Sequence, residues 1–90
     1  MALDKDQREW IACEMASLSV SQVNALVEGS DRIGFGSRLQ QARALRQVIE
    51  VRLDIVRSLE ACRAVSFICD SIVSLDRCIE KLETAEEWLA

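Results

Sequence analysis

The residues with the greatest capacity for chemistry are four cysteines, Cys13, Cys62, Cys69 and Cys78, in a chain of 90 residues that contains no histidine. Without histidine, the commonest general base and metal ligand is missing. Cys62 and Cys69 lie seven residues apart, which is about 10 Å along a helix axis and too far for both to bind one metal ion. We therefore expect no metal site and no cofactor. The cysteines are expected to be small apolar core residues, with a regulatory or intersubunit disulfide as the alternative.

Pairs of carboxylates at helical spacing are the other groups that could perform acid–base chemistry. The pairs are Glu50 with Asp54, Asp76 with Glu80, and Glu83 with Glu87. They lie among other charged residues on faces expected to contact solvent, and nothing in the pattern indicates a cleft. The run Gly34-Phe35-Gly36 lacks the further glycine and the lysine of a phosphate-binding loop. The sequence therefore indicates a protein that is not an enzyme.

The elements that carry these residues are expected to be helices. The chain has no proline, and its three glycines all fall within residues 29–36. The remainder is rich in Ala, Leu, Arg, Glu and Gln, which favour helix. Gly29 suits the left-handed residue that ends a helix, and Ser37-Arg38-Leu39-Gln40 has the pattern of a capping box.

We expect a single all-α domain over residues 1–90. It comprises a helix at about 4–28, a Gly-rich turn at 29–37 and a helical region at 38–89. A break near 61–66 in that region would give a three-helix bundle, and an unbroken helix would give a helical hairpin.

The apolar stripe of residues 38–89 changes side part-way along. The first half of the stripe consists of Leu45, Val48, Ile49, Val56 and Leu59. The second half consists of Ile68, Ile72, Leu75, Ile79 and Leu82. At 100° per residue the second half is rotated by roughly 150° from the first. If the helix breaks, a monomer can close its own core. If the helix is unbroken, the second half of the stripe must be buried against a second copy of the chain. Because either shape leaves apolar surface uncovered, we expect a homodimer in which the second half forms core or dimer contacts.

Charge is divided unevenly along the chain, whose formal net charge is −4. Residues 38–63 hold six arginines and three acidic residues, whereas acidic residues outnumber basic ones on both sides. The acidic flanks are expected to pack beside the basic middle and to neutralise it in part. The alternative is a basic stripe that faces an anionic partner.

Arg52 differs from the other arginines because it falls within the first apolar stripe. A cation on such a seam is expected to find a carboxylate, either Glu14 of the first helix or a residue of a second subunit. It would then fix register and partner choice. The alternative is that Arg52 extends to solvent from the rim of the seam.

Large apolar residues near the ends of the expected helices are candidates for partner contacts. Trp88 and Leu89 close an acidic stretch, a composition that is typical of a protein-binding hot spot. The alternative is that Trp88 caps the core. Phe35 lies in the Gly-rich turn and is expected to plug that end of the bundle. Together with Arg52, these residues form the predicted partner-binding set.

The segment Ile11 to Leu26, with its Ile-Ala pair and its Ser19-Val20-Ser21-Gln22 capping pattern, resembles helix–turn–helix regulators. The resemblance implies a recognition helix at 19–28. The base-reading residues that it implies are Ser21, Gln22 and Asn24. The segment has no lysine or arginine for phosphate contacts. An uninterrupted amphipathic helix is therefore the favoured interpretation, and nucleic acid is not an expected partner.

Neither a signal peptide nor a transmembrane segment is expected. The first six residues lack an apolar run. The longest uncharged stretch, Met15 to Val27, has 13 residues, short of the roughly 18 that span a membrane. We therefore expect a cytoplasmic protein with reduced thiols and no membrane contact.

The function predicted from these features is a small non-enzymatic protein–protein interaction module. It would act as an adaptor, a chaperone-like subunit or a stoichiometric inhibitor or regulator of a partner protein. A helix–turn–helix DNA-binding regulator that uses residues 19–28 is the alternative.

Overall fold

The chain folds into three helices. A computed structural model describes residues 3–28 and 35–89. Within them the elements are α1 (Lys5–Val27), α2 (Phe35–Ser58) and α3 (Cys62–Leu89). No strand occurs in these two ranges, so the all-α prediction is confirmed, with three helices rather than two. The Gly-rich turn falls mainly on residues 29–34, which lie outside the described residues.

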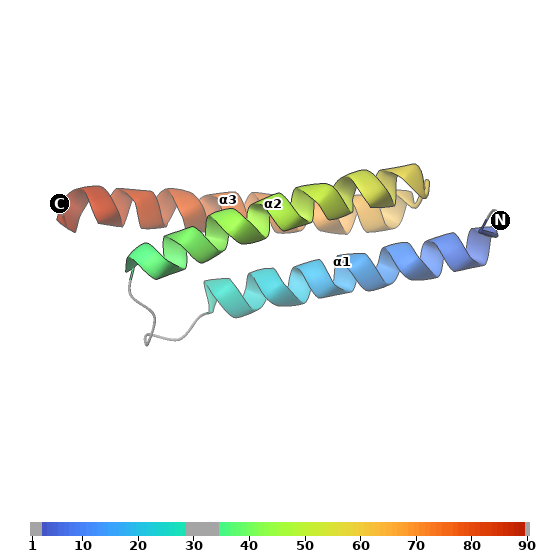
Figure 1. The fold of residues 1–90 in the computed structure, drawn as a ribbon, viewed down its shortest axis with the longest axis horizontal. Coiled ribbons are helices and arrows are strands. Elements are labelled where there is room, and N and C mark those ends of the chain that lie inside the picture. Colours follow the sequence, from blue (N-terminus) through green and yellow to red (C-terminus); the bar gives the residue numbers. More distant parts are fainter. Residues whose placement is uncertain (1–2, 29–34, 90) are drawn as a thin grey trace.

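The helices form an elongated bundle in which each runs antiparallel to the one before it (Figure 1). The bundle measures 53 × 19 × 19 Å and its radius of gyration is 15.1 Å, against about 12 Å for a compact domain of this length. The most extensive contact joins α2 to α3, and the least extensive joins α1 to α2. Three antiparallel helices place the two ends of the chain at opposite ends of the rod (Figure 1).

α1 begins at a complete capping box. The Oδ1 of Asp4 accepts a hydrogen bond from the N–H of Gln7 at 2.8 Å, and the Oε1 of Gln7 accepts one from the N–H of Asp4 at 3.1 Å. The pair satisfies two of the amides that a helix start leaves without partners. The capping box expected at Ser37 does not begin α2, because that helix already includes Phe35.

α2 ends at Ser58, and residues 59–61, which connect it to α3, contain neither glycine nor proline. The N–H of Leu59 still reaches the carbonyl of Ile55 at 3.1 Å, but the N–H of Glu60 bonds only three residues back, to Arg57 at 3.0 Å. Glu60 has a φ of 59°, the left-handed conformation with which many helices end. The break therefore overlaps the predicted window of 61–66 at residue 61.

Replacing Glu60 by glycine is expected to raise the free energy of unfolding by about 0.5–1 kcal/mol, because a residue with a Cβ is strained at this φ. Urea denaturation followed by far-ultraviolet circular dichroism measures the change. Glu60→Ala is the matched control: it removes the charge but keeps the Cβ, so stability should be nearly unchanged. An equal gain in both variants would assign the effect to the carboxylate instead.

A single apolar core runs along the bundle. Its largest fully buried apolar side chains are Val23, Ile49, Val56, Ile68 and Leu75. Ser19 and Ser71 are also buried. Each hydroxyl donates to the carbonyl four residues earlier, that of Met15 at 2.8 Å and that of Phe67 at 3.0 Å. Because these bonds stay within one helix, the two serines need no polar partner across the core.

The two halves of the apolar stripe contribute unequally to this core. In α3, the buried residues of the stripe are Ile68, Leu75 and Leu82, and Ile72 and Ile79 are partly buried against them. In the first half of the stripe, the buried residues are Ile49 and Val56, and Leu45 in α2 and Leu59 just after it are partly buried. Val48 is 45% exposed, so its assignment to the buried face is wrong.

The prediction that the cysteines are core residues is wrong for two of the four. Cys13 and Cys62 are exposed, whereas Cys69 and Cys78 are partly buried against the core. Cys13 follows the buried Ala12 by one step of about 100° around the helix, which turns it away from the core line. Cys13 and Cys62 instead line one groove between α1 and the start of α3.

Candidate functional site

Arg52 joins α2 to α1 through neutral side chains. Its Nη1 donates to Oε1 of Gln22 at 2.6 Å and to Oγ of Ser19 at 3.3 Å. Arg52 takes part in none of the ion pairs formed among the described residues. The predicted pairing of Arg52 with Glu14 inside one chain is therefore wrong. The Arg52 side chain is partly buried, and within residues 3–28 and 35–89 it contacts neutral oxygens only.

The register of α1 against α2 explains why Glu14 is out of reach. Arg52 lies level with Ser19 and Gln22, whereas Glu14 precedes them by five and eight residues. At 1.5 Å per residue, Glu14 is displaced by about 10 Å along the axis. The spacing of apolar residues in α2 predicts that Arg52 lies on the seam between helices. It does not predict which residues of α1 lie level with Arg52, because that depends on the register between the two helices.

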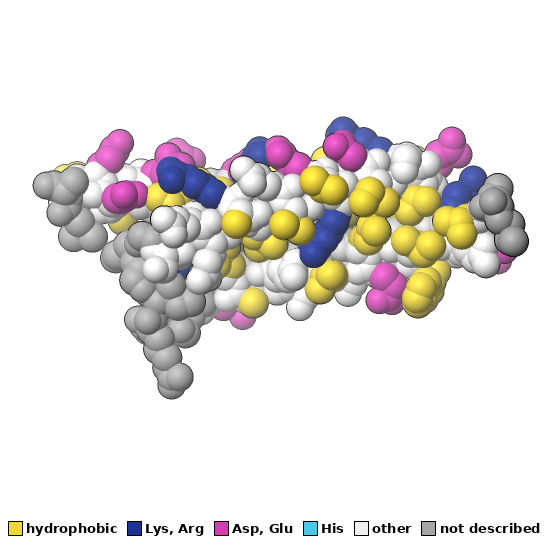
Figure 2. Space-filling view, viewed as in Figure 1, with side chains coloured by type: hydrophobic (Ala, Val, Ile, Leu, Met, Phe, Trp, Pro, Cys, Tyr) yellow, Lys and Arg dark blue, Asp and Glu magenta, His cyan; other side chains and the backbone are white. Residues whose placement is uncertain are grey.

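Apolar side chains near Arg52 are open to solvent on both helices. The hydrogen bond from Arg52 to Gln22 shows that these two sides of α2 and α1 face each other. Val48 and Ile55 lie one turn before and after Arg52, and Leu18 lies one turn before Gln22, so they share these sides. Figure 2 shows apolar side chains gathered over α1 and α2 around a basic side chain.

We call this surface the α1–α2 face. Its exposed apolar residues are Leu18 at 47%, Val48 at 45%, Val51 at 60% and Ile55 at 39%. It also includes Ile11, Glu14 and Arg52. Val48, Val51 and Ile55 recur at three- and four-residue spacing, the signal of a second apolar stripe on α2. This second stripe adjoins the core residues of α2, so in the sequence the two stripes together look like one wide apolar face. The second stripe is therefore easily missed.

The helix–turn–helix alternative requires a helix that starts at Ser19, and α1 continues through that residue. The uninterrupted helix favoured from the sequence is confirmed. Gln22 is bonded to Arg52 on the side of α1 that faces α2. Ser21 and Asn24 line an open groove beside Phe67 of α3. The three side chains implied to read bases therefore diverge between two grooves.

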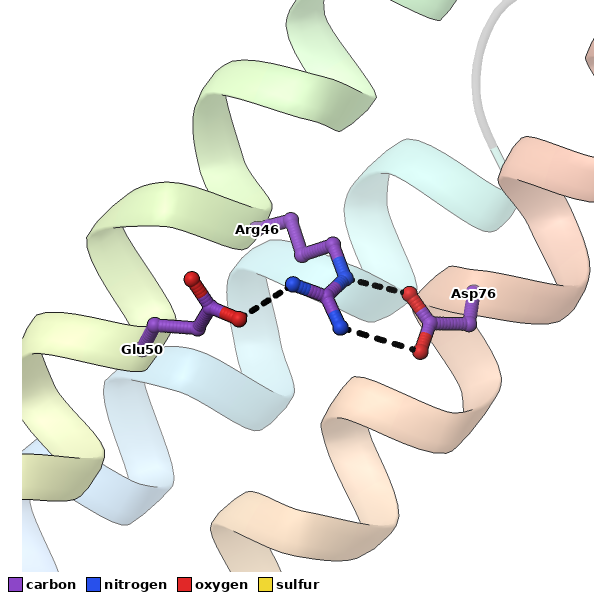
Figure 3. Close-up of polar contacts among 3 residues, drawn as sticks. All are labelled: Arg46, Glu50 and Asp76. Carbon is purple, nitrogen blue, oxygen red and sulfur yellow. Dashed lines mark hydrogen bonds and ion pairs between the residues drawn. The ribbon is translucent and has the colours of Figure 1, made fainter.

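Arg46 connects α2 to α3 (Figure 3). Its Nε donates to Oδ1 of Asp76 at 2.5 Å and its Nη2 to Oδ2 at 3.4 Å, while its Nη1 pairs with Glu50 one turn along α2. These contacts, with Asp76 first, raise the pKa of Arg46 above its usual value. All three side chains are more than a third exposed, so solvent screens the pairs and their contribution to stability is small.

Two other arginines of α2 also bind within the bundle. Arg43 pairs with Glu83 of α3 at 3.6 Å. Arg38 donates from Nη2 to the carbonyls of Leu26 at 3.3 Å and Val27 at 3.4 Å. α1 has no basic residue in its own last turn, so Arg38 supplies the positive charge that complements the helix dipole. The acidic flank on α3 thus neutralises part of the basic middle, as expected from the sequence.

Trp88 lies near the end of α3, on the turns that extend past the start of α2 (Figure 1). Its side chain is 86% exposed, so the alternative that it caps the core is wrong. Glu86 and Glu87 of the same turns are also exposed, whereas Glu83 lies beside α2 and pairs with Arg43. The side chains of Leu89 and Phe35, which complete the predicted partner-binding set, lie outside the described residues.

Within residues 3–28 and 35–89, no three His, Cys, Asp or Glu side chains are grouped so that they could hold a metal ion. In the same part of the chain, no helix has the length and apolar character needed to cross a membrane. No protein family, curated protein or solved structure matches this chain. Function must therefore be inferred from the surfaces described above.

Proposed function

We propose that the chain is a small non-enzymatic protein–protein interaction module, which acts as an adaptor, a chaperone-like subunit or a stoichiometric inhibitor of another protein. The observation that carries this proposal is the exposure of Trp88 on the projecting end of α3. We also propose a cytoplasmic location, as expected from the sequence. A DNA-binding regulator is not proposed, because residues 19–28 do not form a helix separate from the rest of α1.

The free energy available from covering Trp88 is large. A tryptophan side chain buries about 150–250 Å², which corresponds to roughly 4–6 kcal/mol of transfer free energy at 25 cal/mol per Å². Among the described residues none covers Trp88, whose side chain remains 86% exposed. Tryptophan is the residue type most enriched in interface hot spots. A partner with an apolar pocket would gain this free energy on binding.

The charges around Trp88 indicate the chemistry of that partner. Glu86 and Glu87 give the projecting end of α3 an acidic rim. The matching surface is therefore an apolar pocket bordered by lysine or arginine. Such charges mainly raise the association rate and select the partner, whereas the buried indole supplies the affinity.

Affinity capture from extracts of the source organism, read by mass spectrometry, tests this proposal. Trp88→Ala is expected to weaken binding by about 2 kcal/mol, roughly thirtyfold in Kd, and so to lose the captured partner. Trp10→Ala is the matched control. Trp10 is 67% exposed but lies on α1, at the opposite end of the rod, so capture should persist.

Two results would contradict the proposal. One is a Trp88→Ala chain that captures the same proteins as the wild type. The other is a wild-type chain that retains nothing beyond a blank resin. Circular dichroism of both tryptophan variants checks that their helices are intact, which separates loss of binding from loss of fold.

A further inference from the structure

The α1–α2 face combines exposed apolar side chains with a cation, Arg52, that forms no ion pair with any described carboxylate. Val48 and Ile55 lie one turn to either side of Arg52, and both are more than a third exposed. Gln22 and Ser19 offer Arg52 only neutral oxygens. A guanidinium binds most strongly to a carboxylate, which it can contact through two parallel hydrogen bonds. The complement of this face is therefore an apolar surface that brings one carboxylate.

The α1–α2 face itself carries a carboxylate, that of Glu14, displaced along the bundle from Arg52. Glu14 is exposed, and it follows Ile11 by three residues and precedes Leu18 by four. These spacings place it on the row of α1 that borders the face. Within the described parts of the chain, the Glu14 carboxylate has no hydrogen-bonding or ionic partner. The face thus holds an unpaired cation and an unpaired anion, separated by about 10 Å along the bundle.

We propose that the α1–α2 face binds a second copy of this chain as an antiparallel two-fold dimer, in which Arg52 of each copy pairs with Glu14 of the other. This inference goes beyond the proposed function, which concerns Trp88. A two-fold axis perpendicular to the bundle, midway between the heights of Arg52 and Glu14, brings each Arg52 level with the Glu14 of the other copy. A closed interface between identical surfaces requires this reciprocity.

The centre of this arrangement is apolar. The midpoint between the heights of Arg52 and Glu14 falls near Leu18 and Ile55, which are 47% and 39% exposed. On the two-fold axis these residues meet their own counterparts. The ion pairs then lie on either side of an apolar centre, which is the usual anatomy of a protein interface.

A parallel dimer does not satisfy the same charges. If the two-fold axis ran along the bundle, each residue would lie opposite residues of the second copy that are at the same height along the bundle. Arg52 would then face either the second Arg52 or the neutral Gln22. Like charges in contact repel, and Glu14 would remain unpaired. The charges therefore select the antiparallel arrangement.

The side of the bundle is large enough for a stable interface. An axis near Leu18 lies about 18 Å from the start of α1 at 1.5 Å per residue, so the two copies overlap along about 37 Å. With a width of 19 Å, the overlap covers roughly 700 Å² per copy, within the range of about 600–1,000 Å² per partner in standard interfaces. The axis lies nearer the end of the rod where α1 begins. The projecting end of α3 with Trp88 therefore stays outside the overlap in both copies.

Charge-reversal variants of Arg52 and Glu14 test the proposed pairing, with the dimer dissociation constant measured by sedimentation velocity at tens of micromolar protein. The wild type is expected to be a dimer. Arg52→Glu and Glu14→Arg each place like charges opposite one another, and each should raise the dimer dissociation constant at least tenfold. The double variant restores opposite charges at both contacts, so it should return to within about threefold of the wild type. Rescue of this kind separates pairing from damage to the monomer.

Val51→Glu tests the apolar part of the face without altering either charged residue. Val51 is 60% exposed, so the monomer should keep its helices, and the dimer should dissociate. Val73→Glu removes a valine that is 51% exposed on α3 and serves as the matched control, which should remain a dimer. Circular dichroism verifies the fold of both variants.

Three results would overturn the proposal. They are a wild-type monomer at these concentrations, a double variant as weak as the single variants, and a dimer that Val73→Glu dissociates but Val51→Glu does not. None of them alters the result expected for Trp88→Ala. Failure of the dimer and failure of the proposed function are therefore distinguishable.

Discussion

Leu75→Ala is expected to lower the free energy of unfolding by about 2–5 kcal/mol. Leu75 is fully buried in α3, in one cluster with Ile49 and Ile68. Alanine there loses apolar burial and leaves a cavity that a close-packed interior fills only in part. Because small domains are stable by only about 5–15 kcal/mol, the midpoint of urea denaturation should fall strongly. Circular dichroism at a fixed protein concentration measures it.

Val73→Ala is the matched control for this prediction. Val73 precedes Leu75 by two residues in the same helix but is 51% exposed. Its truncation should change stability by no more than about 0.5 kcal/mol. Equal losses in the two variants would mean that Leu75 does not lie in the core.

Ala16→Leu is expected to cost about 1–3 kcal/mol through overpacking. Ala16 is 3% exposed. It belongs to the line of buried residues on α1, which are Ala12, Ala16, Ser19 and Val23. Three of the four are small, which predicts that α1 packs closely against the other helices along this line and that an isobutyl group strains the contact. Leucine should push α1 outward, and urea denaturation would show the loss.

Hydrogen exchange gives this second prediction a local readout. Amides of α1 should lose more protection in Ala16→Leu than amides of α2 or α3, because the contact between α2 and α3 is unchanged. Ala25→Leu, at an exposed position of the same helix, is the control. Alanine and leucine have similar helix propensities, so this variant should remain stable. If Ala16→Leu were equally stable, the leucine would have turned into the open groove that Ala16 lines beside Phe67.

Much of the fold follows from local signals. The absence of proline, the helix-forming composition and the position of the glycines predict the all-α class. Continuity of α1 through Ser19 follows from uninterrupted helical spacing. The end of α2 does not follow in the same way, because Glu60 adopts a conformation normally associated with glycine. Ala61 and Ala64, which follow the break, are buried, and burial depends on contacts between helices that local sequence signals do not describe.

The surfaces were less predictable than the helices. Arg52 could be recognised as a polar residue on an apolar seam, but its contacts with Gln22 and Ser19 depend on the register of two helices. The exposure of Cys13 and Val48 has a related cause. Both lie one step around the helix from a buried residue, and only packing decides where the edge of the core falls. Trp88 is exposed because α3 extends past the start of α2.

The elongation of the bundle determines how it moves through water. A rod 53 Å long and 19 Å wide experiences more friction than a sphere of equal mass, so even a single copy would elute early from a sizing column. Its helical N–H bonds lie nearly parallel to the long axis, and slow end-over-end rotation therefore dominates their magnetic relaxation. Elution volume and rotational correlation time would both overstate the mass. Light scattering or sedimentation equilibrium, which report mass independently of shape, would not.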